Sequence, residues 1–151
     1  MSRPGMPREE RGVINVGLLG LGVVGTGVAA RLLGNGTSVS DVTGRQVNLK
    51  SVLVRDLSRT RGIELPPGVL TTNAEDMLAD PEIDVLVEVM GGTDPAENYL
   101  RSGLSAGKHV VTANKEVMAK SGPDLMALAR NNRANLLFEA SVGGGIPIVG
   151  C

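Results

Sequence analysis

The chain has 151 residues, a net charge of −1 and a hydrophobic fraction of 42%, values that fit one globular domain with its own core. The balanced charge and the near absence of aromatic residues (one Tyr, one Phe and no Trp) exclude nucleic-acid binding through a basic surface or stacked aromatic rings. A single Cys cannot form an internal disulfide and fits the reducing cytoplasm.

The first predicted segment is a disordered leader over residues 1–12, which are polar, contain two prolines and do not resemble a signal peptide. Residues 13–30 carry no charge and approach the length of a membrane span. The stretch nevertheless contains several glycines, and Arg31 follows it directly. We therefore expect no membrane partner.

The first half of the folded part begins with Val13–Leu19, an apolar run rich in β-formers that predicts a buried strand. Residues 26–33 have helical spacing and are followed by Gly34, which predicts a helix. Residues 34–46 predict a loop, and residues 47–54 predict a second strand.

The second half continues this alternation. Asn73 predicts an N-cap for a helix over 74–79, which Pro81 ends. The remaining elements are a strand over 84–90, a helix over 95–106, a strand at His109–Thr112, a helix over 122–132 and a strand over 135–140. Strands that are apolar on both faces and alternate with helices are typical of an α/β fold with a doubly wound, mostly parallel sheet and helices on both faces.

A glycine motif, Gly20-Leu21-Gly22-Val23-Val24-Gly25, lies between the first predicted strand and the first predicted helix. In this context GxGxxG indicates a Rossmann-type dinucleotide site. Gly20 would allow a tight turn, Gly22 would let a pyrophosphate approach the backbone, and Gly25 would let the helix pack closely. The alternative interpretation is a plain strand–turn–helix whose glycines serve packing only.

The end of the second predicted strand bears on the choice between NADP and NAD. Arg55 occupies the place where an acid would bind the ribose 2′-hydroxyl of NAD, and an arginine there accepts the 2′-phosphate of NADP. Arg59 and Arg61 either add positive charge or form a solvated basic loop. NADP is favoured, but NAD stays open because Asp56 can turn inward.

Four motifs, "GLGVVG", "VRDLS", "HVVTANKE" and "EASVGGGIPIV", together resemble homoserine dehydrogenase over residues 13–150. The resemblance implies an NAD(P)-dependent enzyme that reduces aspartate 4-semialdehyde to homoserine, on the route to threonine and methionine. It also implies a cytoplasmic enzyme that is a homodimer or homotetramer at full length.

The resemblance also implies roles for particular residues. It places Gly20, Gly22, Val23, Val24 and Gly25 along the pyrophosphate, Arg55 at the adenosine ribose or its phosphate, Gly91, Gly92 and Thr93 along the cofactor, and Lys115 near the nicotinamide. For Lys115, which follows a predicted strand in a predicted loop, the alternative is an ordinary surface lysine.

The resemblance further implies a sodium site formed by Glu139 and the backbone carbonyls of Val142, Gly144 and Ile146. Oxygen ligands suit a hard cation. The alternative, a glycine-rich hinge, is compatible with cation binding.

The family's substrate domain and its principal proton-transferring lysine have no counterpart in this sequence. We therefore expect a Rossmann domain over 13–140 and a glycine-rich segment over 141–151 that leads toward an absent catalytic domain. Such a polypeptide is expected to show no appreciable homoserine oxidation by itself.

Two other functions stay open: a stand-alone dinucleotide-binding or regulatory module, and the cofactor domain of a related semialdehyde dehydrogenase. Aspartate-semialdehyde dehydrogenase, the alternative enzyme of this kind, needs a nucleophilic cysteine for acyl transfer, and Cys151 follows no helix or base motif. The single histidine, His109, has no metal-binding cluster near it in sequence and is predicted to be structural. Glu88 is a candidate buried acid without an assigned role.

Overall fold

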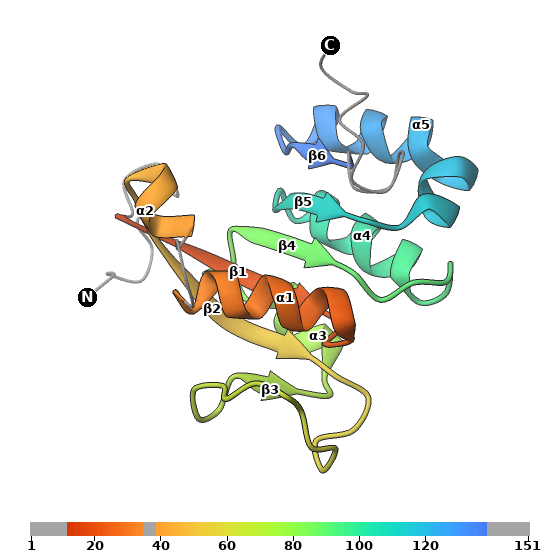
Figure 1. Ribbon diagram of the computed structural model, residues 1–151. Coiled ribbons are helices and arrows are strands. Elements are labelled where there is room, and N and C mark those ends of the chain that lie inside the picture. Colours follow the sequence, from red (N-terminus) through yellow and green to blue (C-terminus); the bar gives the residue numbers. More distant parts are fainter. Residues whose placement is uncertain (1–11, 35–38, 139–151) are drawn as a thin grey trace.

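Six strands and five helices make up the part of the chain that the computed structural model describes, residues 12–34 and 39–138 (Figure 1). The strands are β1 (Val13–Leu19), β2 (Gln46–Leu53), β3 (Leu70–Thr71), β4 (Val85–Glu88), β5 (His109–Thr112) and β6 (Leu136–Leu137). The helices are α1 (Val23–Leu32), α2 (Val39–Thr43), α3 (Ala74–Ala79), α4 (Ala96–Ser105) and α5 (Lys115–Asn131).

The strands form one sheet in the order β3-β2-β1-β4-β5-β6, and every pairing is parallel. This is the strand order of the doubly wound Rossmann fold, which confirms the predicted fold class. Glu88, the last residue of β4, is level with Leu19 on β1 and with Thr112 on β5. The carboxyl ends of the three central strands therefore lie side by side.

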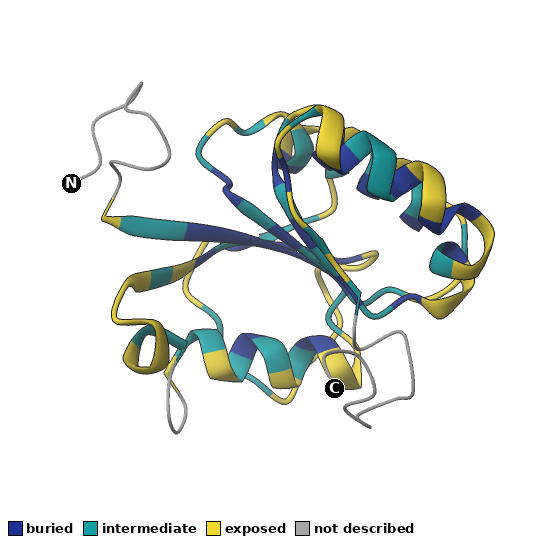
Figure 2. Ribbon diagram, turned by 90° about the horizontal axis from the view of Figure 1, so that it is seen from above, coloured by how far each residue is buried: buried dark blue, intermediate teal, exposed yellow. Residues whose placement is uncertain are grey.

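Each face of the sheet is covered by helices and has its own hydrophobic core (Figure 2). Consecutive residues of a strand point to opposite faces, so Leu18 packs with Ala29 of α1 while Leu19 packs in the cluster that contains α4 and α5. In β2, Val52 and Leu53 divide between the two faces in the same way. Burial on both faces explains why the carboxyl-terminal half of β1, the carboxyl end of β2, most of β4 and the centre of β5 are apolar.

Several predicted elements match closely. β1 and β5 have the predicted bounds, and β2 is the predicted strand displaced by one residue. Asn73 caps α3 as predicted, because its side chain accepts hydrogen bonds from the backbone N–H groups of Glu75 and Asp76.

Several elements differ from the expectations. The first helix begins at Val23, inside the glycine motif, and the predicted loop over 34–46 contains α2 and the start of β2. The two-residue strand β3 was not predicted. The helix predicted over 122–132 begins seven residues earlier, at Lys115. Of the strand predicted over 135–140, the described part is β6 at Leu136–Leu137.

The uncharged stretch over 13–30 consists of β1, the glycine turn and most of α1. Within the described ranges, no helix is both long and apolar enough to cross a bilayer. The leader predicted over 1–12 lies outside the described residues except for its last residue.

Candidate functional site

The glycine turn (residues 20–25) connects the carboxyl end of β1 to α1. Gly20 has a φ of 104°, a conformation that residues with a Cβ rarely adopt. A Cβ on Gly25 would lie 2.2 Å from the carbonyl oxygen of Gly20, closer than any real Cβ contact. The steric reasons predicted for these two glycines are therefore both present: one forms the turn, and the other lets α1 lie against it.

The amino terminus of α1 has no side-chain cap. Its N-cap residue is Gly22, and its first turn contains no acidic residue. By contrast, asparagine side chains cap α3 and α5. A Cβ on Gly22 would meet nothing within 4 Å, and Val23 is 94% exposed. The first N–H groups of α1 thus face an open surface without a side-chain acceptor, an arrangement suited to a bound anion.

The glycine turn lies at the point where the sheet changes direction, since β1 is flanked by β2 on one side and β4 on the other. Doubly wound folds bind ligands at this crevice. The segment after β4 contacts the turn: a Cβ on Gly20 would lie 3.1 Å from Met90 Cγ, and one on Gly25 would lie 3.3 Å from Val89 Cγ2.

The predicted residues Gly91, Gly92 and Thr93 belong to this β4 loop (residues 89–95). Gly91 and Gly92 are exposed and have φ values of 75° and 71°. The fold therefore brings the β4 loop and the glycine turn to the same edge of the sheet, as a shared cofactor site requires.

Arg55 is exposed two residues beyond the end of β2, at the same edge. Asp56, the predicted competitor, does not turn inward. Its Oδ1 accepts hydrogen bonds from the Ser58 hydroxyl at 2.7 Å and the Ser58 N–H at 2.8 Å. These bonds hold the pKa of Asp56 below its ordinary value. The Asp56 carboxylate thus closes a turn within its own loop.

The Arg61 guanidinium also shapes this loop. It donates to the carbonyl oxygen of Arg59 at 2.7 Å and to the carbonyl oxygen of Asp56. Arg61 therefore holds the backbone of its own loop together by hydrogen bonds.

Lys115 is the first residue of α5 and not part of a loop, which corrects the sequence interpretation. It is exposed and follows β5 at the carboxyl edge of the sheet. The preceding residue, Asn114, is buried and was missed. Its Oδ1 accepts from the Val117 N–H at 3.1 Å, and its Nδ2 donates to the Gly92 carbonyl oxygen at 2.6 Å. Asn114 thus joins the start of α5 to the β4 loop.

His109 has a structural contact: its Nδ1 accepts a hydrogen bond from the Asn135 N–H at 3.0 Å. Over residues 12–34 and 39–138, no group of three His, Cys, Asp or Glu side chains is placed to hold a metal ion. The predicted sodium ligands Glu139, Val142, Gly144 and Ile146 lie outside the described residues. The sodium site stays a prediction.

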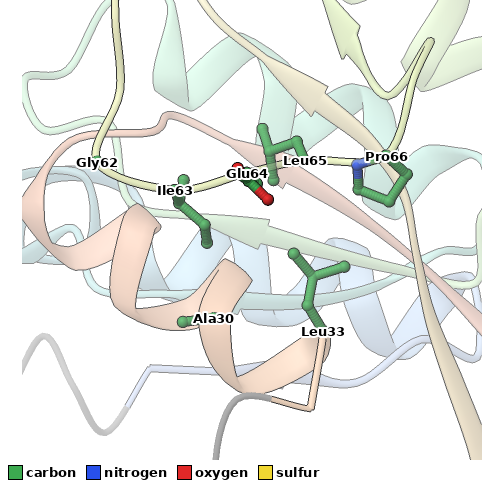
Figure 3. Close-up of a pocket in the computed structure, with 7 residues that line it drawn as sticks. All are labelled: Ala30, Leu33, Gly62, Ile63, Glu64, Leu65 and Pro66. Atoms are coloured by element: carbon green, nitrogen blue, oxygen red, sulfur yellow. The ribbon is translucent and has the colours of Figure 1, made fainter.

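A pocket of about 590 Å³ lies between the end of α1 and residues 62–66 (Figure 3). Ala30 and Leu33 line the side near α1, and residues 62–66 line the opposite side. Ala30 and Leu33 are at the opposite end of α1 from Gly22. The pocket is therefore distinct from the crevice at the glycine turn.

Residues 20–139 match the family model described as "Homoserine dehydrogenase, NAD binding domain". Homoserine dehydrogenase of Bacillus subtilis (strain 168) is 47% identical over 136 residues, which are 90% of this chain and 31% of that protein. This chain thus spans about a third of the length of the curated relatives it matches.

Solved structures agree with the sequence comparison. A crystal structure of homoserine dehydrogenase from Thiobacillus denitrificans superposes with a TM-score of 0.80 at 43% identity, covering 90% of this chain and 31% of that one. A hyperthermophilic archaeal homoserine dehydrogenase in complex with NADPH superposes with a TM-score of 0.73 at 25% identity, covering 91% and 47%. With its glycine turn, uncapped α1 and strand order, this chain belongs to the homoserine dehydrogenase family, and its residues 20–139 are an NAD-binding domain.

Proposed function

We propose that this chain binds NADP(H) at the glycine turn and forms the cofactor side of a homoserine dehydrogenase. The reaction is hydride transfer between the cofactor and aspartate 4-semialdehyde, which gives homoserine. The uncapped amino terminus of α1 at Gly22 is the observation that carries the proposal. Family membership supports it, as does the NADPH bound to the archaeal relative.

The proposed roles follow from where the residues lie. The first N–H groups of α1, from Val23 onward, would bind the pyrophosphate, and the helix dipole would add to the attraction. Residues 91–93 would line the nicotinamide half. The Lys115 ammonium would supply positive charge near the substrate carbonyl, whose oxygen becomes negative during reduction. When bound, the nicotinamide supplies or accepts the hydride.

The first test replaces Gly22 with Val. A side chain at this position meets nothing in the protein, so the fold should persist while the pyrophosphate is excluded. We expect NADPH affinity to fall by at least about 100-fold in calorimetry, an affinity change of about 2.7 kcal/mol. Gly27→Val is the matched control, since Gly27 is also an exposed α1 position with nothing within 4 Å of a Cβ. Equal affinities in the wild type and Gly22→Val would refute the assignment.

We further propose that NADP is preferred over NAD. Arg55 is exposed at the edge where the adenosine ribose would lie, and the Asp56 carboxylate is already engaged by Ser58. An Arg55–phosphate hydrogen bond would be charge-assisted and worth roughly 1.5–3 kcal/mol.

Arg55→Ala should therefore weaken NADPH about 10- to 100-fold and leave NADH nearly unchanged in the same titration. Arg130→Ala is the matched control, because Arg130 is an exposed arginine in the last turn of α5, at the opposite edge of the sheet. Parallel losses for the two cofactors would mean that Arg55 does not discriminate between them.

We also propose that Glu139 and the carbonyls of Val142, Gly144 and Ile146 bind Na⁺. The support is the family resemblance and the oxygen donor set, which suits a hard cation. We expect the ²³Na NMR line to broaden with the wild-type chain and to broaden less with Glu139→Ala. Identical line widths for the two chains would contradict the site. The homodimeric or homotetrameric assembly and the cytoplasmic location stay predictions.

A further inference from the structure

We propose that Glu88 is a positioning residue, whose buried carboxylate holds the β4 loop and the start of α5 in the geometry that receives the nicotinamide half of the cofactor. This inference rests on the proposed function, because it concerns one half of the same site. The observation behind it is a buried acidic side chain: Glu88 ends β4 in the middle of the sheet and is 0% exposed. A carboxylate is buried at a large cost in free energy unless hydrogen bonds replace its water.

Both carboxylate oxygens of Glu88 accept a hydrogen bond. Oε1 accepts from the Met90 N–H at 2.8 Å, and Oε2 accepts from the Thr112 hydroxyl at 2.5 Å. Met90 lies in the β4 loop, and Thr112 ends the neighbouring strand β5, where it is also 0% exposed. The Glu88 carboxylate therefore bonds both the loop that follows β4 and the end of the adjacent strand β5.

The hydrogen bonds continue from Thr112 to Asn114 in a fixed direction. The Asn114 N–H donates to the Thr112 hydroxyl oxygen at 3.0 Å, so the hydroxyl proton is directed toward Glu88. The Asn114 side chain then donates to the Gly92 carbonyl oxygen and accepts from the Val117 N–H. These hydrogen bonds and the backbone between them form a closed path, here called the Glu88 ring. Its members are Glu88, Met90, Gly92, Asn114 and Thr112.

The Glu88 ring anchors the residues proposed to contact the nicotinamide half. Gly91 and Gly92 have positive φ values and are exposed, so the rest of the core does not fix them. Glycines lose more conformational entropy on ordering than other residues. A site that contains them therefore gains ligand affinity when hydrogen bonds order it before the ligand binds. Lys115 follows Asn114 directly, so the Asn114 side chain that caps α5 also positions Lys115.

Thr112→Val tests the ring with little change of shape, since it replaces the hydroxyl with a methyl group. Thr112→Ser keeps the hydroxyl and is the matched rescue variant. Each chain is titrated with NADPH and with 2′-phospho-ADP-ribose, which contains the phosphates and both riboses but not the nicotinamide. We expect Thr112→Val to lose about tenfold in NADPH affinity and less than twofold for 2′-phospho-ADP-ribose, and Thr112→Ser to bind both as the wild type does.

Glu88→Gln gives a second, independent variant. Met90 and Thr112 donate to different oxygens of Glu88. In Gln one of these oxygens becomes an NH₂ donor, so one of the two bonds loses its acceptor, and the same selective loss is expected. Glu88→Gln combined with Thr112→Val should lose no more than either change alone, because each breaks the same ring. If Glu88→Gln does not fold, as judged by circular dichroism, the two Thr112 variants decide.

The outcomes separate the two proposals. A wild-type chain that binds neither ligand would overturn the proposed function. A wild type that binds both ligands equally, or variants that lose both equally, would overturn the positioning role of Glu88 while leaving the cofactor site intact.

Discussion

Two glycines of the same motif serve opposite purposes. Gly25 faces inward, where a Cβ would collide with the Gly20 carbonyl oxygen, whereas Gly22 faces outward, where a Cβ would meet nothing. The first is required by the fold whatever binds, and the second becomes necessary only when a ligand approaches the backbone. Substitutions at the two positions should therefore separate folding from binding.

Gly25→Ala should destabilise the chain, because the added methyl overlaps backbone atoms that cannot move without opening the turn. Overpacking of this kind costs about 1–3 kcal/mol. Gly27→Ala, two residues further along the same helix and in open space, should instead stabilise by about 0.5–1 kcal/mol through helix propensity. The midpoints of urea unfolding compare the two variants, and a Gly25→Ala midpoint at or above that of the wild type would contradict the packing role.

Helix α5 shows how tertiary packing overrides local signals. Gly122 and Pro123 together indicate a helix start, yet α5 begins at Lys115 and continues through Pro123. Four of its five buried residues follow one another at intervals of four and form a stripe on one side of the helix: Val117, Ser121, Leu125 and Ala129. Burial of this stripe supplies most of the helix stability, and local propensity alone does not contain that information.

A charged cluster fastens α5 to α4. Glu97 of α4 accepts hydrogen bonds from the Ser121 hydroxyl at 2.8 Å and from Arg101, and it pairs with Lys120 Nζ at 3.2 Å. The Ser121 hydroxyl, the Arg101 guanidinium and the Lys120 ammonium lower the pKa of Glu97 to about 2. Hydrogen-bond donors from α4 and α5 thus converge on the Glu97 carboxylate. The polar contact between the two helices therefore depends on the negative charge of Glu97.

Glu97→Gln should lower the free energy of unfolding at pH 7. A carboxylate whose pKa is lower in the folded than in the unfolded chain stabilises the fold fully above the unfolded value, about 4.3, and loses this contribution as the pH falls toward about 2. The difference between the wild type and Glu97→Gln should therefore shrink between these two pH values. Thermal unfolding at several pH values measures it, with Glu64→Gln as an exposed control. A difference that does not depend on pH would exclude the charge as its source.

The architecture of the whole molecule was predictable from the sequence, but the Glu88 ring was not. Largely apolar strands that alternate with helices lead to a parallel sheet covered on both faces, and the glycine motif marks the edge of the sheet where the cofactor is proposed to bind. The ring instead depends on which strands are neighbours and on their exact register, as in the pairing of Glu88 with Thr112, 24 residues later. Asn114 was missed for a related reason: its capping role became visible only once α5 was known to begin beside it.

The strand order also determines when the central strand can be completed during synthesis. β1 is made first, yet Val16 on its second edge pairs with Val85, 69 residues later in the chain. Until β4 has left the ribosome, a row of unpaired N–H and C=O groups along β1 is open to other chains. Contacts this distant in sequence also form slowly. A nascent chain that carries the complete glycine turn but not yet β4 therefore exposes one edge of its central strand to aggregation.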